Sequence, residues 1–250
     1  MNILEIKNIS VEINGKRILQ DINLSVHKGE TVLFFGPNGS GKTTLLMTIA
    51  GIPEYEVVDG EIILNGKNIT SMDVDKRVKL GLGIGFQAPP EIVGVKLGDM
   101  IKICSGKRPD DELSEEELRL IEKFELKEFI NRDVNLGFSG GEKKRAEILQ
   151  LLAMKPKILL LDEPDSGVDV ESLRLIGKEI QKYLDENDAS ALIITHHGDI
   201  SEYVNAECAY VVVDGRIWCS GNPERIHKNI LKNGYRSCVK CQLRHQMEEC

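Results

Sequence analysis

The chain's clearest chemical signal is a glycine-rich stretch, residues 36–43, which reads GPNGSGKT and fits the pattern G-x-x-x-x-G-K-[ST] without a mismatch. An apolar segment typical of a strand comes before it, and a helical pattern follows it. That is the context in which such a loop binds phosphate. Glycines let backbone N–H groups surround phosphate oxygens, and the following helix adds its positive end. The alternative is a glycine-rich turn that contains a lysine by chance. That alternative does not explain the strand before the loop or the helix after it.

Two side chains complete this loop. Lys42 is expected to neutralise the charge of the β- and γ-phosphates, and the Thr43 hydroxyl is expected to reach Mg²⁺. The residues expected to contact a bound nucleotide are Gly36, Asn38, Gly39, Ser40, Gly41, Lys42, Thr43 and Thr44.

A pair of acids follows another apolar segment. Residues 158–161 read ILLL, and Asp162 and Glu163 come next. Parallel α/β sheets place ligands at their strand ends. Asp162 is expected to hold Mg²⁺ through its water shell, and Glu163 is the candidate general base for an attacking water. An acidic strand exit that leads to a helix N-cap is the alternative, and without the phosphate loop it would be favoured.

A second glycine loop precedes a long helical pattern. Residues 136–142 read LGFSGGE, and Ser139, Gly140 and Gly141 would present a hydroxyl and backbone N–H groups at a helix N-terminus. Such an arrangement binds anions. A capped helix start, with Ser139 as N-cap and Glu142 at the third helical position, explains the same residues equally well.

In this order the motifs resemble those of the ABC ATPases. The SGGE of the second loop corresponds to that family's signature, and residues 159–164 (LLLDEP) correspond to its Walker B segment. Gln87 stands where the family has its Q-loop glutamine, residues 166–169 (SGVD) resemble its D-loop, and His196 stands at its switch histidine. The resemblance covers about residues 1–234.

The resemblance implies an α/β fold, the ABC ATPase nucleotide-binding domain, in which a P-loop core sheet carries an antiparallel β subdomain and an inserted helical subdomain. It implies a catalyst of ATP hydrolysis with ATP and Mg²⁺ as cofactors. Two copies would face head to tail, so that each phosphate loop meets the partner's Ser139 and the partner's Gly141 in an ATP-dependent homodimer. The catalytic residues implied are Glu163, His196 at the γ-phosphate, and Gln87, which would also bind Mg²⁺.

Several stretches resemble one branch of that family, the SufC-type ATPases of the SUF iron–sulfur cluster assembly system. These stretches are residues 87–95 (QAPPEIVGV), residues 135–145 (NLGFSGGEKKR), Asp165 in place of the usual threonine, and Ile13 at the adenine position. The partners implied are SufB- and SufD-like scaffold proteins, held through roughly residues 87–103. The nucleotide-binding subunit of a membrane transporter is the alternative. A metal- or redox-sensing module with a vestigial ATPase is disfavoured by the complete set of catalytic residues.

Two details of this resemblance carry their own expectations. Ile13 replaces the aromatic residue on which the family stacks adenine, which predicts weaker nucleotide affinity and similar binding of ATP and GTP. The basic run 143–145 is either a solvated helix face or the source of a lysine, such as Lys144, that pairs with Glu163 and keeps it idle.

The elements that must position these residues are strands and one helical insertion. Continuous apolar runs predict core strands covered on both faces at 31–35, 83–86, 158–161 and 191–195. Alternating residues near the N-terminus predict an antiparallel β layer. Asn-Gly and Asp-Gly pairs predict tight hairpins at 14–15, 59–60, 65–66 and 214–215.

The composition changes at about residues 95–138, which predicts a helical subdomain inserted in the ATPase domain, 1–234. Ser114 and Glu117 form a capping-box pattern that opens a helix over 114–124. Residues 235–250 are expected to be a separate, cysteine-rich tail.

The tail has the spacing C-x2-C-x3-H-x4-C, formed by Cys238, Cys241, His245 and Cys250. Four such ligands could bind Zn²⁺ or an iron–sulfur centre. A frayed, partly helical terminus with reactive thiols is the alternative. The tail is not part of the resemblance to the SUF ATPases.

Composition limits the remaining partners. The net charge of −8 argues against general binding of nucleic acid or anionic membranes. No apolar run approaches the ~20 residues of a membrane-spanning helix, so direct membrane insertion is not expected. The first residues read as a strand rather than a signal peptide, so the six cysteines are expected to be thiols or metal ligands in a cytoplasmic protein.

Overall fold

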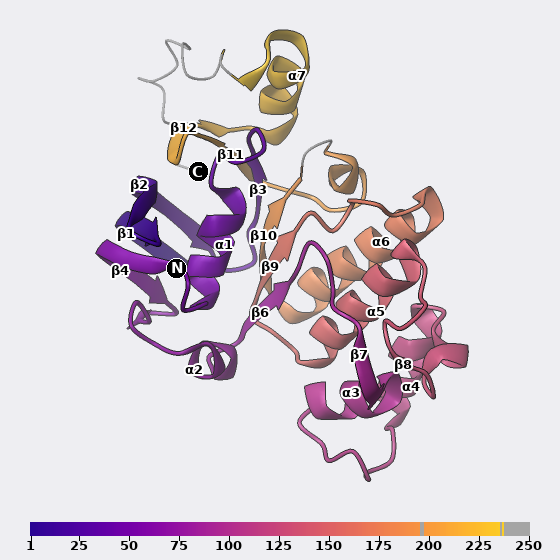
Figure 1. The fold of residues 1–250 in the computed structure, drawn as a ribbon. Coiled ribbons are helices and arrows are strands. Elements are labelled where there is room, and N and C mark those ends of the chain that lie inside the picture. Colours follow the sequence, from indigo (N-terminus) through magenta and orange to yellow (C-terminus); the bar gives the residue numbers. More distant parts are fainter. Residues whose placement is uncertain (196–197, 236, 238–250) are drawn as a thin grey trace.

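The computed structural model describes residues 1–195, 198–235 and 237 of the chain. Its centre is a six-stranded sheet in the order β12-β11-β3-β10-β9-β6 (Figure 1). Neighbouring strands from β11 to β6 run parallel, and the edge strand β12 is antiparallel to β11. The strands are β3 (Thr31–Phe35), β6 (Leu82–Gly85), β9 (Ile158–Asp162), β10 (Ser190–Ile194), β11 (Cys208–Val213) and β12 (Arg216–Gly221).

The four core strands predicted from apolar runs are confirmed, each within one residue of its expected bounds. Their continuous hydrophobicity reflects burial on both faces of the sheet, because side chains alternate between faces along a strand. In β3, Val32 and Phe34 join one buried cluster, whereas Leu33 and Phe35 join the other.

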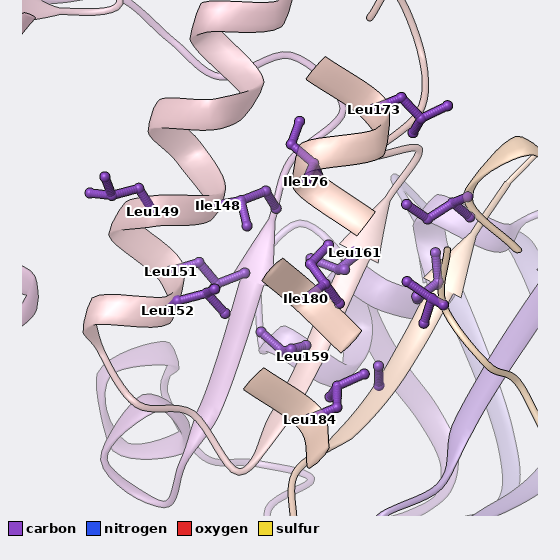
Figure 2. Packing of buried hydrophobic residues seen from close by; sticks show 14 of the residues in the cluster. Ile148, Leu149, Leu151, Leu152, Leu159, Leu161, Leu173, Ile176, Ile180 and Leu184 are labelled. Atoms are coloured by element: carbon purple, nitrogen blue, oxygen red, sulfur yellow. The ribbon is translucent and has the colours of Figure 1, made fainter. Parts of the chain in front are cut away.

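Two long helices cover one face of this sheet. They are α5 (Gly140–Ala153) and α6 (Val170–Asn187). Figure 2 shows Ile176, Ile180 and Leu184 of α6 beside Leu159 and Leu161 of β9. Full burial of such a side chain contributes about 1.5–3 kcal/mol, so this layer fixes α5 and α6 firmly to the sheet.

The other face is covered by α1 (Lys42–Ala50) and a four-stranded antiparallel sheet in the order β2-β1-β4-β5. Its strands are β1 (Asn2–Ile13), β2 (Lys16–His27), β4 (Glu56–Leu64) and β5 (Lys67–Asn68). The predicted antiparallel layer is therefore present. The hairpins at 14–15, 65–66 and 214–215 are confirmed, since each joins two adjacent antiparallel strands.

The hairpin predicted at 59–60 is wrong. Asp59 and Gly60 lie inside β4, where the pairing with β1 shifts register between Lys7 and Ser10. Gly60 has a φ of 84°, and a Cβ there would lie 2.3 Å from the carbonyl oxygen of Lys7. Glycine is needed because two backbones come close at a bulge, and no turn is formed.

A mainly helical segment connects β6 to α5. It contains β7 (Ile92–Lys96), α3 (Leu97–Cys104), α4 (Glu115–Lys123), a 3-10 turn (Lys127–Phe129) and β8 (Asp133–Val134). The capping box predicted at the start of α4 is confirmed, with Ser114 and Glu117 bonded reciprocally. In Figure 1 these helices lie beyond α5, away from the antiparallel sheet.

The remaining elements are α2 (Val74–Lys79), a 3-10 turn (Asp199–Glu202) and α7 (Pro223–Asn233). Among the described residues, no helix is both long enough and apolar enough to span a membrane.

The C-terminal end of α1 is capped by a buried side chain from α2. The Arg77 guanidinium donates to the carbonyl oxygens of Thr48 and Ile49 at 2.8 Å each, and to those of Thr70 and Met72 at 2.9 and 2.7 Å. Helix ends leave carbonyls without partners, and a buried cation satisfies them strongly. Arg77 therefore joins α1 to the chain segment that leads into β6.

Candidate nucleotide site

The phosphate loop runs from the end of β3 to the start of α1, and its path is fixed by packing. A Cβ on Gly36 would lie 2.2 Å from the carbonyl oxygen of Val212 in β11. Gly41 has a φ of 102°, and a Cβ there would lie 2.5 Å from the Leu19 side chain in β2. These two glycines are required because the loop passes so close to both sheets.

Lys42 is buried at the base of this loop. Its ammonium group donates to the carbonyl oxygens of Gly36 at 2.7 Å and Pro37 at 3.1 Å. Burial lowers the pKa of Lys42, and the charges of Glu163 and Asp162 partly oppose that shift. The cation thus lies over the loop and within reach of both acids, where an anionic ligand would be attracted.

Two buried polar groups in this region have no hydrogen-bond partner within the described chain. They are the Ser40 hydroxyl, from the loop, and both carboxylate oxygens of Asp162, at the end of β9. Buried polar groups without partners are rare, so their grouping marks a place that a polar ligand completes. The donor set fits nucleotide-bound Mg²⁺, which prefers carboxylate, hydroxyl and phosphate oxygens.

Burial raises the pKa of Asp162. The nearby Thr43 hydroxyl lowers it in part, although it does not complete a hydrogen bond, and the charge of Glu163 raises it further. A divalent cation would remove this penalty by pairing with the carboxylate. Thr43 and Asp162 would hold such a cation, and the chemistry it would supply is polarisation of the terminal phosphates of the nucleotide.

Glu163, the candidate base, is buried and follows β9 with a φ of 49°. This left-handed conformation is uncommon for a residue other than glycine and turns the side chain out of the strand direction. The amide nitrogen of Gln87 donates to a Glu163 carboxylate oxygen at 2.8 Å. The structure therefore brings together two residues that lie 76 positions apart in sequence.

These groups meet because their strands are close in the core sheet. Lys42 follows β3, Gln87 follows β6, Asp162 ends β9 and Glu163 comes directly after it, in a sheet with the local order β3-β10-β9-β6. Their position at the carboxyl edge agrees with the expectation for parallel sheets.

The second glycine loop lies apart from this group. Ser139 is the N-cap of α5, and it forms a capping box with Glu142, as the local alternative predicted. Ser139 and Gly140 are exposed. Among the described residues, no hydrogen bond or ion pair joins residues 139–141 to the phosphate loop.

The two glycines of this loop are also required by packing within one chain. A Cβ on Gly140 would lie 2.6 Å from the carbonyl oxygen of Gly167, and one on Gly141 would lie 2.6 Å from the Asp169 carboxylate. Asp169 is itself the N-cap of α6 and accepts from the Ser172 amide at 2.8 Å. The starts of α5 and α6 are thus in close contact.

Thr195 binds Asp165, one of the residues on which the expected resemblance to the SUF ATPases rests. Its hydroxyl donates to the Asp165 carboxylate at 2.5 Å and accepts from the Gly198 amide at 2.9 Å. Burial raises the pKa of Asp165, and the Thr195 hydrogen bond lowers it in part. His196, the expected switch histidine, lies outside the described residues.

Both alternatives offered for Lys144 are wrong, because it neither pairs with Glu163 nor lies on a solvated face. Lys144 is buried and forms an ion pair with Glu147 at 3.1 Å. Its ammonium group also donates to the carbonyl oxygen of Phe86 at 2.5 Å. The neighbouring Lys143 pairs with Glu91 at 2.8 Å instead.

Sequence reasoning missed Glu147 and Arg77. Burial raises the pKa of Glu147, and Lys144 partly opposes the shift. The available signal was Glu147 within the mostly apolar stretch 146–153, with Lys144 three residues before it. Arg77 gave no comparable signal, because its acceptors are backbone atoms.

Two expectations stay untested by this geometry. Ile13 lies half-buried at the end of β1, opposite Lys16. The proposed metal ligands Cys238, Cys241, His245 and Cys250 lie outside the described residues. Within residues 1–195, 198–235 and 237, no group of three or more histidine, cysteine, aspartate or glutamate side chains is arranged to hold a metal.

Comparison with known proteins identifies the family. A family model described as "ABC transporter" matches residues 19–166. A "Probable ABC transporter ATP-binding protein" of Streptococcus pyogenes serotype M3 is 42% identical over 243 residues, which cover 94% of each chain. "Vegetative protein 296" of Bacillus subtilis is 42% identical over 231 residues, 88% of this chain and 87% of that protein. "Probable ATP-dependent transporter ycf16" of Trieres chinensis is 37% identical over 245 residues, 93% and 96% of the two chains.

A solved structure gives the same result. A nucleotide-free ATP-binding cassette from an ABC transporter superposes with a TM-score of 0.78 at 26% identity, covering 96% of this chain and 99% of that one. The chain belongs to the ABC ATPase family and has its α/β cassette fold. It is therefore an ATP-binding enzyme that hydrolyses ATP.

Proposed function

We propose that this chain hydrolyses ATP at composite sites shared with a second copy of itself, and that closure of the pair deforms a scaffold of the SufB/SufD kind during iron–sulfur cluster assembly. The observation that supports the composite ATP site is the exposed N-terminus of α5. Ser139 and Gly140 offer anion-binding groups on the surface, apart from the phosphate loop of the same chain. A nucleotide held by a second chain would supply the missing phosphate.

Within one composite site, each described residue has a distinct task. The loop from Gly36 to Thr44 wraps the phosphates, and Lys42 neutralises them. Asp162 and Thr43 hold Mg²⁺, with Gln87 beside them. Glu163 takes a proton from the attacking water, and His196 contacts the γ-phosphate. The contact of Gln87 with Glu163 at 2.8 Å supports placing both residues at the same reacting group.

The scaffold half rests on the region after Gln87. Val93 in β7 is 74% exposed, and Phe86 and Ile103 are also exposed apolar residues. Their position within residues 87–103 or next to it supports docking of a protein partner there. Asp165, bound to Thr195, supports the SUF branch because transporter ATPases usually have threonine at this position.

The organisation proposed with this function is an ATPase domain, 1–234, with a helical subdomain inserted at about 95–138 and a tail at 235–250. The protein would work in the cytoplasm. The tail, which could hold Zn²⁺ or an iron–sulfur centre, would be separate from the ATPase mechanism.

The second candidate function is the nucleotide-binding subunit of a membrane transporter. The names of two relatives, a "Probable ABC transporter ATP-binding protein" and a "Probable ATP-dependent transporter", favour it. The ATPase mechanism would be the same, and the partner would be a permease with several membrane spans.

Capture of partners by the Glu163→Gln variant distinguishes these functions. The variant keeps the shape of the side chain but loses the base, so it should remain in the ATP-bound pair. With ATP, we expect soluble scaffold proteins from native extract. Capture of a multi-span membrane protein would establish the transporter function. A Glu163→Gln chain that stays monomeric with ATP, by analytical ultracentrifugation, would contradict the composite site.

A further inference from the structure

The signature helix α5 contains an unusual ion pair on its inner face. Lys144 is 3% exposed and Glu147 is 9% exposed, and their charged atoms lie 3.1 Å apart. Ion pairs at i and i+3 usually lie in solvent and contribute little. A buried pair must recover the cost of removing two charges from water through further hydrogen bonds.

Those further bonds are made to one residue of another segment. The Lys144 ammonium donates to the Phe86 carbonyl oxygen at 2.5 Å, and the Glu147 carboxylate accepts from the Phe86 amide at 2.6 Å. Strand β6 ends at Gly85, so Phe86 has just left the sheet. The ion pair therefore satisfies both the N–H and the carbonyl group of the Phe86 backbone.

Phe86 immediately precedes Gln87, which donates to Glu163 at 2.8 Å. The next residues are also attached to the signature region. The Asn135 amide donates to the Pro90 carbonyl oxygen at 2.8 Å, and Lys143 pairs with Glu91 at 2.8 Å. The segment from 86 to 91 is thus held by α5 and by the loop before it.

We propose that Lys144 and Glu147 are positioning residues for ATP hydrolysis. Their hydrogen bonds to the Phe86 backbone fix the position of Gln87 relative to Glu163. The N-cap of the same helix is Ser139, about 12 Å along the axis from Glu147 at 1.5 Å per residue. A shift of the α5 N-terminus is therefore transmitted to Gln87 through a rigid helix. This inference rests on the catalytic roles proposed for Gln87 and Glu163.

The test compares kcat and KM for ATP in a paired variant, Lys144→Met with Glu147→Gln. The change leaves no buried charge unpaired and keeps an acceptor for the Phe86 amide, but removes the donor to the Phe86 carbonyl. We expect kcat to fall about 10-fold or more, because small displacements of catalytic groups lower reaction rates by at least this much. KM should stay within about twofold, because the phosphate loop is untouched.

A cycle with Gln87→Ala decides whether the pair acts through Gln87. In the Gln87→Ala background, the paired variant should cause no further loss of kcat. Additive losses would overturn the inference, and so would an unchanged kcat in the paired variant. Lys155→Met, which removes an exposed ion pair just after the other end of α5, is the matched control and should leave kcat unchanged.

Two measurements keep the test decisive if the paired variant is unstable. Lys144→Arg retains a cationic donor and should keep most of the wild-type kcat, whereas equal loss in Lys144→Arg and Lys144→Met, both folded by circular dichroism, would overturn the inference. Hydrogen exchange in a peptide covering 84–92 should quicken in Lys144→Met without any nucleotide; unchanged exchange would also overturn it. Normal turnover by Glu163→Gln would instead refute the proposed base, while leaving the exchange result valid.

Discussion

The amide of Gln87 donates a hydrogen bond of 2.8 Å to the carboxylate of Glu163. One oxygen of the candidate base is therefore engaged by a residue from a neighbouring strand. Because Gln87 is in turn attached to α5 through Phe86, the state of the base depends on the position of the signature helix.

Replacement of Glu163 by glutamine should lower ATP hydrolysis about 10²-fold or more, since loss of a general base has effects of this size. ATP binding should persist because Lys42 and the loop are unchanged. Phosphate release with Mg²⁺ and excess ATP measures the rate. Glu186→Gln, at the exposed far end of α6, should behave as wild type; equal rates in all three proteins would rule out Glu163 as base.

Arg77→Met should destabilise the chain by about 3 kcal/mol, because four carbonyl oxygens lose a charged donor. For a chain of this size that corresponds to a fall in Tm on the order of 10 °C. Scanning calorimetry measures the change. Arg17→Met, which removes an exposed pair with Glu12, should shift the Tm far less. A similar small shift in both variants would contradict the capping role.

Ile13→Tyr should strengthen ATP binding by about 0.5–1.5 kcal/mol, roughly 2- to 13-fold in Kd, if residue 13 lies against adenine. The wild-type chain should bind ATP and GTP with similar affinity. Titration of both nucleotides by calorimetry tests this. Val58→Tyr adds the same ring at an exposed position of β4 and should change neither Kd. A strong preference of the wild-type chain for ATP would refute the expectation.

The thiol of Cys104 should react slowly in the folded chain. Burial raises the pKa of Cys104 from 9.0 to about 11. Only the thiolate attacks alkylating agents, so its labelling at pH 8 should be about 100-fold slower than in the unfolded chain. The rate should rise tenfold per pH unit up to about pH 11 in the folded state. Mass spectrometry of the peptide around Cys104 follows the reaction, and equal rates with and without urea would contradict the shift.

The C-terminal motif should be tested by metal analysis of the full chain and of a chain that ends at Tyr235. Metal that is present in the first and absent from the second would support Cys238, Cys241, His245 and Cys250 as ligands. Equal, near-zero metal in both proteins would remove the idea.

Much of the fold followed from local signals in the sequence. The strands at 31–35 and 158–161 are continuously apolar, and both capping boxes depend on residues three positions apart. Such patterns are set within a few residues, so sequence alone predicts them. The phosphate loop was equally recognisable, because its glycines and Lys42 form one continuous motif.

The failures involved partners that are distant in sequence. Asp59-Gly60 has the composition of a turn, but pairing with β1 made it a bulge. Lys144 was given two alternatives, a solvated face or a pairing with Glu163, but it is buried beside Glu147 and donates to the Phe86 carbonyl oxygen, 58 residues away. A side chain can satisfy its charge in several ways, and tertiary packing decides among them. The contact of Gln87 with Glu163 was likewise set by the order of strands.

The alternation of β9 has a consequence for how this enzyme can change. Leu159 and Leu161 point to the face covered by α5 and α6. Because side chains alternate along a strand, Leu160 and Asp162 belong to the opposite face, toward α1. One alternating pattern of side chains therefore places both the core leucines and the Asp162 carboxylate. Insertion or deletion of a single residue before Asp162 would turn the side chains on one side of that change to the opposite face of the sheet. Insertion or deletion of two residues would leave each side chain on its original face. The strand can therefore tolerate substitution far better than any odd change in length.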